Sequence, residues 1–149
     1  TVDKLVHSYV VLLSIFDIEL EYLVNFEKLL ESASDLNRNL TIYFVTTLAI
    51  LFENKRLFSH FIKIQKKPAN KIETLYENLF KKTQYLVDYA SSKKLNNDLF
   101  KKNVFSMLIK SYNLNTNTII SDNFPLLTNY YNLGNYKDQD LDDLFKEIN

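Results

Sequence analysis

The sequence predicts an all-α protein, and three observations support that prediction. Apolar residues make up 46% of the 149 residues, as in ordinary folded domains. They recur at spacings of three and four along most of the chain, which is the pattern of an amphipathic helix. One glycine and two prolines leave few breakers for strands and tight turns. We expect an elongated bundle of five to six helices, two of them long, in a single domain covering residues 1–149.

The first two predicted helices are the long ones. An apolar stripe of leucines and aromatic residues extends over residues 5–30, and the Ser-rich run at 31–35 ends it. A second helix is expected over about residues 39–64. Its first half, as far as Phe52, is apolar on nearly every side, so we expect that half to be the most buried element.

Shorter helices follow. Pro68 suits the start of a third helix over about residues 69–90, because its fixed φ is that of a first helical turn. Ile72 and either Tyr85 or Leu86 are expected on its inner face. A fourth helix should cover about residues 97–112, with its inner face formed by Leu99, Val104, Met107 and Leu108.

The last third of the chain begins with a predicted loop. Residues 113–123 are rich in Asn, Thr and Ser, whose side chains compete for backbone hydrogen bonds. Pro125 should then open a short helix that extends to about residue 133. Asp138 or Asp140 is expected to cap a final helix, because carboxylates favour a helix N-terminus.

Composition excludes several classes of function. A single glycine cannot supply a dinucleotide-binding or P-loop motif, so we expect no nucleotide cofactor. The absence of cysteine excludes disulfides, a zinc ribbon and a thiol nucleophile. Lys plus Arg and Asp plus Glu number 18 each, so no net charge attracts nucleic acid or an acidic membrane. We expect no covalent catalysis and no catalytic residues.

No metal site is expected either. Residues 138–142 spell the D-x-D-x-D start of a calcium-binding loop, but Asp143 stands where glycine is needed and Asn149 where a bidentate glutamate is needed. His7 and His60 are the only histidines and have no carboxylate at ligand spacing. No apolar stretch reaches the roughly 20 residues that span a bilayer, and we read no secretory signal, so we expect a cytoplasmic protein.

Glu19 stands one turn before Tyr22, at the edge of the first apolar stripe. Residues 19–26, ELEYLVNF, resemble the T-E-x-x-Y-[LV]-x-x-L motif of the Dbl homology domain, with Ile18 in place of the threonine. That domain is the helical catalytic module of Rho-family guanine nucleotide exchange factors. Residues 51–54, LFEN, and the aromatic-rich stretch at 72–89 resemble the segments that follow in the family.

The third region of that family reads approximately L-I-x-P-x-Q-R-x-x-R-Y-P-L-L-L. Residues 108–110, LIK, and 124–127, FPLL, resemble its two ends, and residues 140–148 resemble the start of the helix after it. Ser111 replaces the proline, the Gln-Arg pair is missing, and the insert at 113–123 lengthens the connection. These departures leave open a scaffold that binds a GTPase without promoting exchange.

The resemblance implies that Glu19 contacts a switch segment of a small GTPase. It also implies exchange without covalent chemistry, because the factor binds the nucleotide-free GTPase better than the nucleotide-bound form. From the residues themselves, the inward stripe of the short helix is predicted to be Phe124, Leu127 and Tyr131. Asn129 and Asn132 would then point outward, and could lie beside Glu19 on one partner-binding face.

The predicted function is therefore protein binding, most specifically of a Rho-type small GTPase whose nucleotide exchange is promoted. The alternative is a helical adaptor, or viral-type helical bundle, that accepts a partner's amphipathic helix in an apolar groove. A third possibility is a structural piece whose long helices pair with another chain. A central apolar helix inside a compact globule would favour the adaptor, whereas an exposed Glu19 near the short helix would favour the GTPase.

Overall fold

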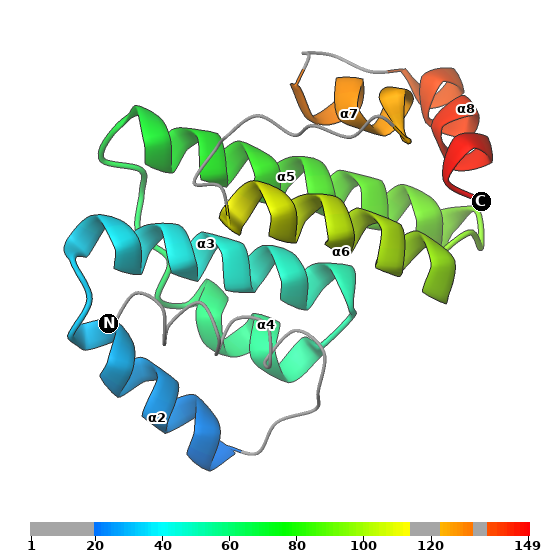
Figure 1. Cartoon of the computed structure of the whole chain (residues 1–149). Helices are drawn as coiled ribbons and strands as arrows, with labels where there is room; N and C mark the ends of the chain where they lie inside the picture. The colour runs from blue at the N-terminus through cyan, green and yellow to red at the C-terminus, as the bar shows by residue number, and fades with distance from the viewer. Residues whose placement is uncertain (1–19, 114–122, 133–136) are drawn as a thin grey trace. The chain divides into compact units, whose positions relative to one another are not determined.

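The computed structural model describes residues 20–113, 123–132 and 137–149, which form seven helices and no strand (Figure 1). The all-α prediction is therefore confirmed, and these residues alone contain more helices than the five to six expected. The chain divides into two compact units, Thr1–Phe80 and Lys81–Asn149, and the boundary between them falls inside the helix Lys71–Ser92. The elongated shape and the single domain stay predictions. In chain order the helices are α2 (Leu20–Glu31), α3 (Asp35–Leu51), α4 (Lys55–Ile62), α5 (Lys71–Ser92), α6 (Asp98–Asn113), α7 (Pro125–Asn132) and α8 (Asp138–Ile148).

The core of the first unit is built on α3, as the sequence predicted. Every residue from 41 to 49 is buried, and α3 packs against α4. The buried hydroxyls of Thr46 and Thr47 donate to the carbonyls of Ile42 and Tyr43, at 2.6 and 2.7 Å. Each hydroxyl thus has a partner four residues earlier in the same helix, so its burial leaves no unmade hydrogen bond.

The prediction of one continuous helix over residues 39–64 is wrong, because side-chain caps divide this stretch into α3 and α4. The Ser34 hydroxyl accepts the N–H of Asn37 at 3.2 Å, so α3 begins four residues earlier than expected. After α3, Glu53 takes the left-handed conformation with φ of 54°. The Asn54 side chain then accepts the N–H of Leu57 at 3.1 Å and starts α4 as a separate helix.

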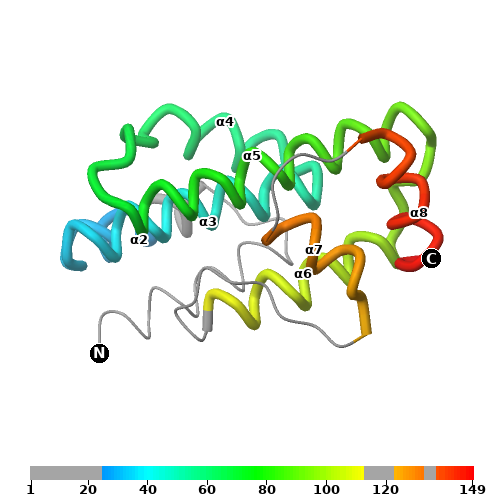
Figure 2. The backbone as a smooth tube through the Cα atoms, turned by 90° about the horizontal axis from the view of Figure 1, so that it is seen from above, coloured from blue at the N-terminus to red at the C-terminus, as the bar shows by residue number. Residues whose placement is uncertain are grey.

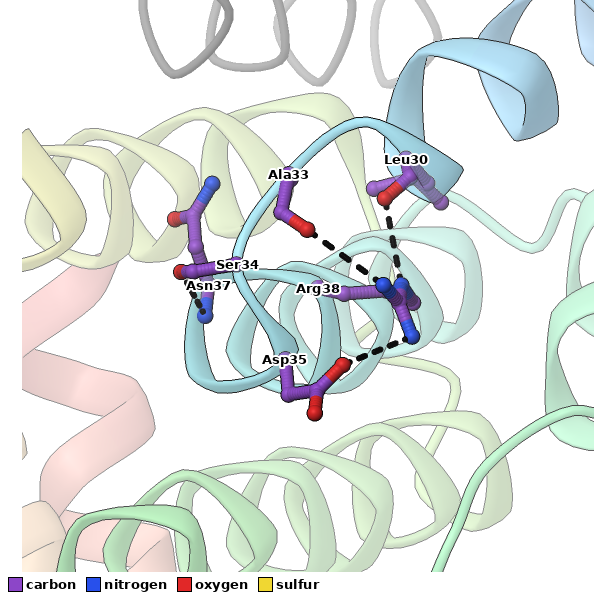
Figure 3. Close-up of polar contacts among 6 residues, drawn as sticks. All are labelled: Leu30, Ala33, Ser34, Asp35, Asn37 and Arg38. Atoms are coloured by element: carbon purple, nitrogen blue, oxygen red, sulfur yellow. Dashed lines mark hydrogen bonds and ion pairs between the residues drawn. The ribbon is translucent and has the colours of Figure 1, made fainter.

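Arg38 joins the end of α2 to the start of α3 (Figure 3). Its guanidinium donates to the carbonyl of Leu30 at 3.1 Å and to that of Ala33 at 3.3 Å, and pairs with Asp35 at 3.1 Å. The last carbonyls of a helix have no partner within it. Arg38 therefore satisfies the carboxyl end of α2 from the next helix, and fixes the sharp turn between the two.

Helix α2 also contacts α4. The rings of Phe26 and Phe61, both fully buried, meet edge to face with centroids 5.6 Å apart. At the border of this apolar contact, the His60 ring nitrogen Nε2 lies 2.7 Å from a carboxylate oxygen of Glu27. His60 is thus a half-buried boundary histidine, as expected.

Two expectations about inward residues are wrong in the same way. Ile72 and Leu99 are both 47% exposed. Each lies in the first turn of its helix, α5 or α6, where no preceding turn shields a side chain. Further along, the predicted inner residues Val104, Met107 and Leu108 of α6 are buried. Of the two alternatives in α5, Leu86 is fully buried and Tyr85 is 49% exposed.

No helix in the described part of the chain is long and apolar enough to cross a bilayer.

The burial of α3 makes a matched pair of substitutions informative. Leu48 is fully buried and Leu36, in the same helix, is 40% exposed. Leu48→Ala should lower the free energy of unfolding by about 2–5 kcal/mol, because it removes buried methyl groups and leaves a cavity. Leu36→Ala should change it by less than about 1 kcal/mol. Chemical denaturation followed by circular dichroism measures both, and equal effects would contradict the central place of α3.

Candidate functional site

The candidate site is α7, the short helix of the second unit. An isolated helix of eight residues is unstable in water. Pro125 occupies its first position, where a missing N–H costs nothing. One side of α7 is buried, as the predicted stripe requires, through Leu127, Tyr130 and Tyr131, while Phe124 is half-buried. The neighbouring helices therefore supply most of what keeps α7 helical.

Glu147 of α8 occupies the amino end of α7. Its two carboxylate oxygens accept the backbone N–H groups of Leu126 and Leu127, at 3.0 and 3.1 Å. These N–H groups have no partner within the helix and lie at its positive end, where a carboxylate is most stabilising. Helix α8 packs against both α7 and α6, which holds Glu147 in place (Figure 2). The amino end of α7 is thus filled, and is not open to a phosphate.

Lys82 of α5 occupies the opposite end. Its ammonium group donates to the carbonyls of Tyr130 and Tyr131, both at 3.0 Å, and lies 6.0 Å from the centre of the Tyr130 ring. A cation is favoured at the negative carboxyl end of a helix. Burial lowers the pKa of Lys82, because desolvation disfavours the charged form. The two ends of α7 therefore meet opposite charges from two other helices.

The buried side of α7 is joined to α5 by two phenols. The Tyr131 hydroxyl lies 2.8 Å from that of Thr83, and the Tyr130 hydroxyl donates to the carbonyl of Lys82. Burial raises the pKa of both tyrosines above the ordinary value, since a phenolate would be poorly solvated there. Both phenols are therefore neutral in the folded protein.

Tyrosines of α5 also hold α8. Tyr85 donates to a carboxylate oxygen of Asp138 at 3.1 Å, and Tyr89 donates to the carboxylate of Asp142. The hydrogen bond to Asp142 raises the pKa of Tyr89 to about 12, and the Tyr89 ring stacks on Phe145 with centroids 5.8 Å apart. Helix α5 thus anchors both α7 and the helix that carries Glu147.

The start of α8 differs by one residue from the prediction. Lys137 is the residue before the first helical turn, and Asp138 is already helical. The carboxylate of Asp140 accepts the backbone N–H of Lys137 at 3.0 Å. Asp140 therefore stabilises the start of α8 from inside the first turn and does not cap it from outside.

The outer side of α7 is exposed and uncharged. Asn129 and Asn132 are both exposed there, as are Pro125 and Leu126, and none of the eight residues of α7 carries a charge. The amide side chains both donate and accept hydrogen bonds. The outer face of α7 therefore consists of apolar and amide groups, and charged contacts stabilise the helix at its two ends.

The structure places the predicted site residues unevenly. Asn129 and Asn132 lie on the exposed side of α7, as the sequence analysis proposed. Glu19 and His7 lie outside the described residues, so a common face with Glu19 stays a prediction. Among the described residues, no three His, Asp or Glu side chains are grouped so that they could hold a metal ion.

Lys82 and Glu147 were not predicted from the sequence. Lys82 is three residues after Leu79 and four before Leu86, both of which are buried. That spacing places Lys82 at the edge of the apolar stripe. A charged residue at a stripe position is the signal that could have identified it.

No protein-family model matches the sequence, and comparison with curated proteins and with solved structures finds no match.

Removing the carboxylate charge should destabilise α7. Glu147→Gln keeps the size of the side chain but offers one acceptor in place of two and no charge. We expect the free energy of unfolding to fall by about 1 kcal/mol. Asp143→Asn, an exposed acid on the same helix, is the control and should change it by less than about 0.5 kcal/mol. Equal values from denaturant titrations would show that the Glu147 contact contributes nothing.

Alkaline pH should unfold the second unit through its buried phenols. Because the pKa values of Tyr130 and Tyr131 are raised above 10.0, the unfolded chain loses these protons first. The stability that they contribute is complete below about pH 10 and is lost as the pH rises further. The lowered pKa of Lys82 acts in the opposite direction, but involves one proton against two.

The measurement is tyrosinate absorbance together with circular dichroism as the pH is raised. Part of the tyrosinate signal should appear only as helix content falls, and Tyr130→Phe/Tyr131→Phe should reduce that part. Complete titration of the tyrosines with the helices intact would contradict the burial of these phenols.

Proposed function

We propose that this chain is a helical protein-binding domain that contacts its partner through the outer face of α7, and that the partner is a Rho-type small GTPase. The observation that supports the proposal is the double anchoring of α7 by Glu147 and Lys82. A surface helix already fixed in position loses little conformational entropy when a partner binds it. A cytoplasmic location is part of the same proposal.

The chemistry of this face suits a protein better than a nucleic acid. The centres of protein interfaces are depleted in charged residues, and the exposed side of α7 has none. A nucleic-acid surface requires cations for the phosphates. The anion site that the amino end of α7 could offer is already taken by Glu147.

The GTPase as partner comes from the resemblance at residues 19–26, 51–54, 72–89, 108–110 and 124–127. In this proposal Glu19 contacts a switch segment, while Asn129 and Asn132 form hydrogen bonds beside it. Exchange needs only that the chain binds the nucleotide-free GTPase more tightly than the loaded form, because that difference shifts the equilibrium toward nucleotide release. Without the family's Gln-Arg pair, a weaker form of the proposal is binding with little exchange.

One observation favours a second candidate, a helical adaptor. Residues 41–49 of α3 are buried on every side, as expected for the central helix of a globule that accepts a partner's amphipathic helix. The partner would then contact an apolar groove and not the amide face of α7. The two candidates therefore differ in which substitutions abolish binding.

The test measures release of fluorescent GDP from a panel of Rho-type GTPases and complex formation with their nucleotide-free forms. Asn129→Arg/Asn132→Arg should reduce binding at least about tenfold, because two unpaired cations would be buried at the interface. Asn78→Arg, the same change on an exposed position of α5, is the control and should have no effect. Melting temperatures of all variants should match the unchanged chain.

Glu19→Ala tests the GTPase proposal separately from the more general proposal that α7 binds a protein. If exchange occurs, this change should abolish it while leaving thermal stability unchanged. No acceleration and no complex with any GTPase of the panel would remove the GTPase. Capture of an amphipathic helical peptide with equal affinity by the unchanged chain and by Asn129→Arg/Asn132→Arg would then support the adaptor.

A further inference from the structure

Positive charge is concentrated in one stretch of the first unit. Six of the 18 basic residues fall between positions 55 and 71, and no Asp or Glu lies between Glu53 and Glu73. The chain as a whole is neutral, whereas residues 54–72 have a formal charge of +6. The chain is therefore neutral overall but has a positive field around this stretch. The six basic residues are Lys55, Arg56, Lys63, Lys66, Lys67 and Lys71.

All six of these side chains are exposed, and within the described structure none forms an ion pair. Two acids of the same unit have other partners. Glu73 is 2% exposed and accepts a hydrogen bond from Asn70 at 2.6 Å, and Glu27 is engaged with His60. The positive charge is thus free to act on a partner.

The geometry of α4 and of the connection to α5 gathers this charge. Arg56 lies in α4, and Lys63 directly follows that helix in a helical conformation. Because they are seven residues apart, they lie on the same side, with the exposed Ser59 between them. Lys66, Lys67 and Lys71 follow in the connection and at the start of α5, which can be traced in Figure 1. Tyr43 fixes this connection, because its hydroxyl donates to the backbone carbonyl of Lys66. We call the six basic residues, together with Ile64 and Ile72, the basic surface.

Two exposed isoleucines lie among these charges. Ile64, directly after Lys63, is 37% exposed, and Ile72, directly after Lys71, is 47% exposed. Segments that lie on a membrane surface combine aliphatic side chains with neighbouring lysines in this way. The aliphatic groups enter the headgroup region, and the ammonium groups remain among the phosphates.

Nucleic acid fits the same surface less well. Five of the six cations are lysine, and lysine lacks the planar fork with which arginine binds bases and phosphates in pairs. No exposed aromatic side chain is available between 54 and 72 for stacking on bases. Phe58 stacks on Phe80, Phe61 is fully buried, and the His60 ring is held by Glu27.

We propose that the basic surface binds the anionic headgroups of a lipid bilayer, with Ile64 and Ile72 inserted between them. This role is separate from partner binding by α7, because it depends on residues of another part of the chain. Clusters of four to eight Lys and Arg bind anionic leaflets in this way. The attraction is electrostatic and acts within a Debye length, so it must weaken with salt.

The test is co-sedimentation of the whole chain with phosphatidylcholine vesicles that contain about 30% phosphatidylserine, and with phosphatidylcholine alone. We expect binding to the first only, strong at about 0.1 M NaCl and lost at about 1 M. Lys63→Gln/Lys66→Gln/Lys67→Gln/Lys71→Gln should lower the affinity about 600-fold, at roughly fivefold for each of the four lysines at the headgroups. Ile64→Ser/Ile72→Ser should weaken binding with the charge unchanged.

The matched control removes four exposed lysines elsewhere, as Lys94→Gln/Lys102→Gln/Lys110→Gln/Lys146→Gln. It lowers the net charge by the same amount and should keep most of the vesicle binding. No binding to the anionic vesicles, or an equal loss in both quadruple variants, would overturn the proposal. Tighter binding of a duplex or single-stranded oligonucleotide than of vesicles, lost with the same four lysines, would also overturn it in favour of nucleic acid. Sodium phosphate should compete no better than chloride at equal ionic strength, and stronger competition would indicate a site for free phosphate.

Discussion

Opposite charges at the two ends of α7 are the interaction on which the second unit depends. Eight residues make too few internal hydrogen bonds for a stable helix, and most of their N–H and C=O groups are terminal. Glu147 satisfies one end and Lys82 the other. Since Glu147 comes from α8 and Lys82 from α5, the position of α7 requires that both of those helices are in place. The outer face of α7 can therefore be uncharged, because the charged contacts that stabilise the helix come from α5 and α8.

The first unit uses the same principle with two neutral side chains and one cation. Side chains of Ser34 and Asn54 accept the free N–H groups at the starts of α3 and α4, and Arg38 donates to the free carbonyls at the end of α2. Side-chain hydrogen bonds therefore set the end of α2 and the starts of α3 and α4, in a sequence with few glycines and prolines. Between its polar ends, α3 has a stretch, residues 41–49, that is buried on every side.

This explains which features could be predicted from the sequence. Periodicity identified the buried half of α3 and the inner residues of α5 and α6, because burial follows helical spacing. It could not separate α3 from α4, since the break depends on the cap at Asn54 and the left-handed Glu53 inside an unbroken apolar pattern. Spacing gave the outward direction of Asn129 but not the contact of Lys82, which joins residues 48 and 49 positions apart.

The most direct test of α7 as the contact surface is hydrogen–deuterium exchange, measured by mass spectrometry on the chain alone and with a nucleotide-free Rho-type GTPase. The account predicts slower exchange on binding in the peptides that cover residues 125–132, with little change in those that cover 41–49. Binding that slows exchange elsewhere and leaves 125–132 unchanged would contradict it, and so would the absence of any change on mixing.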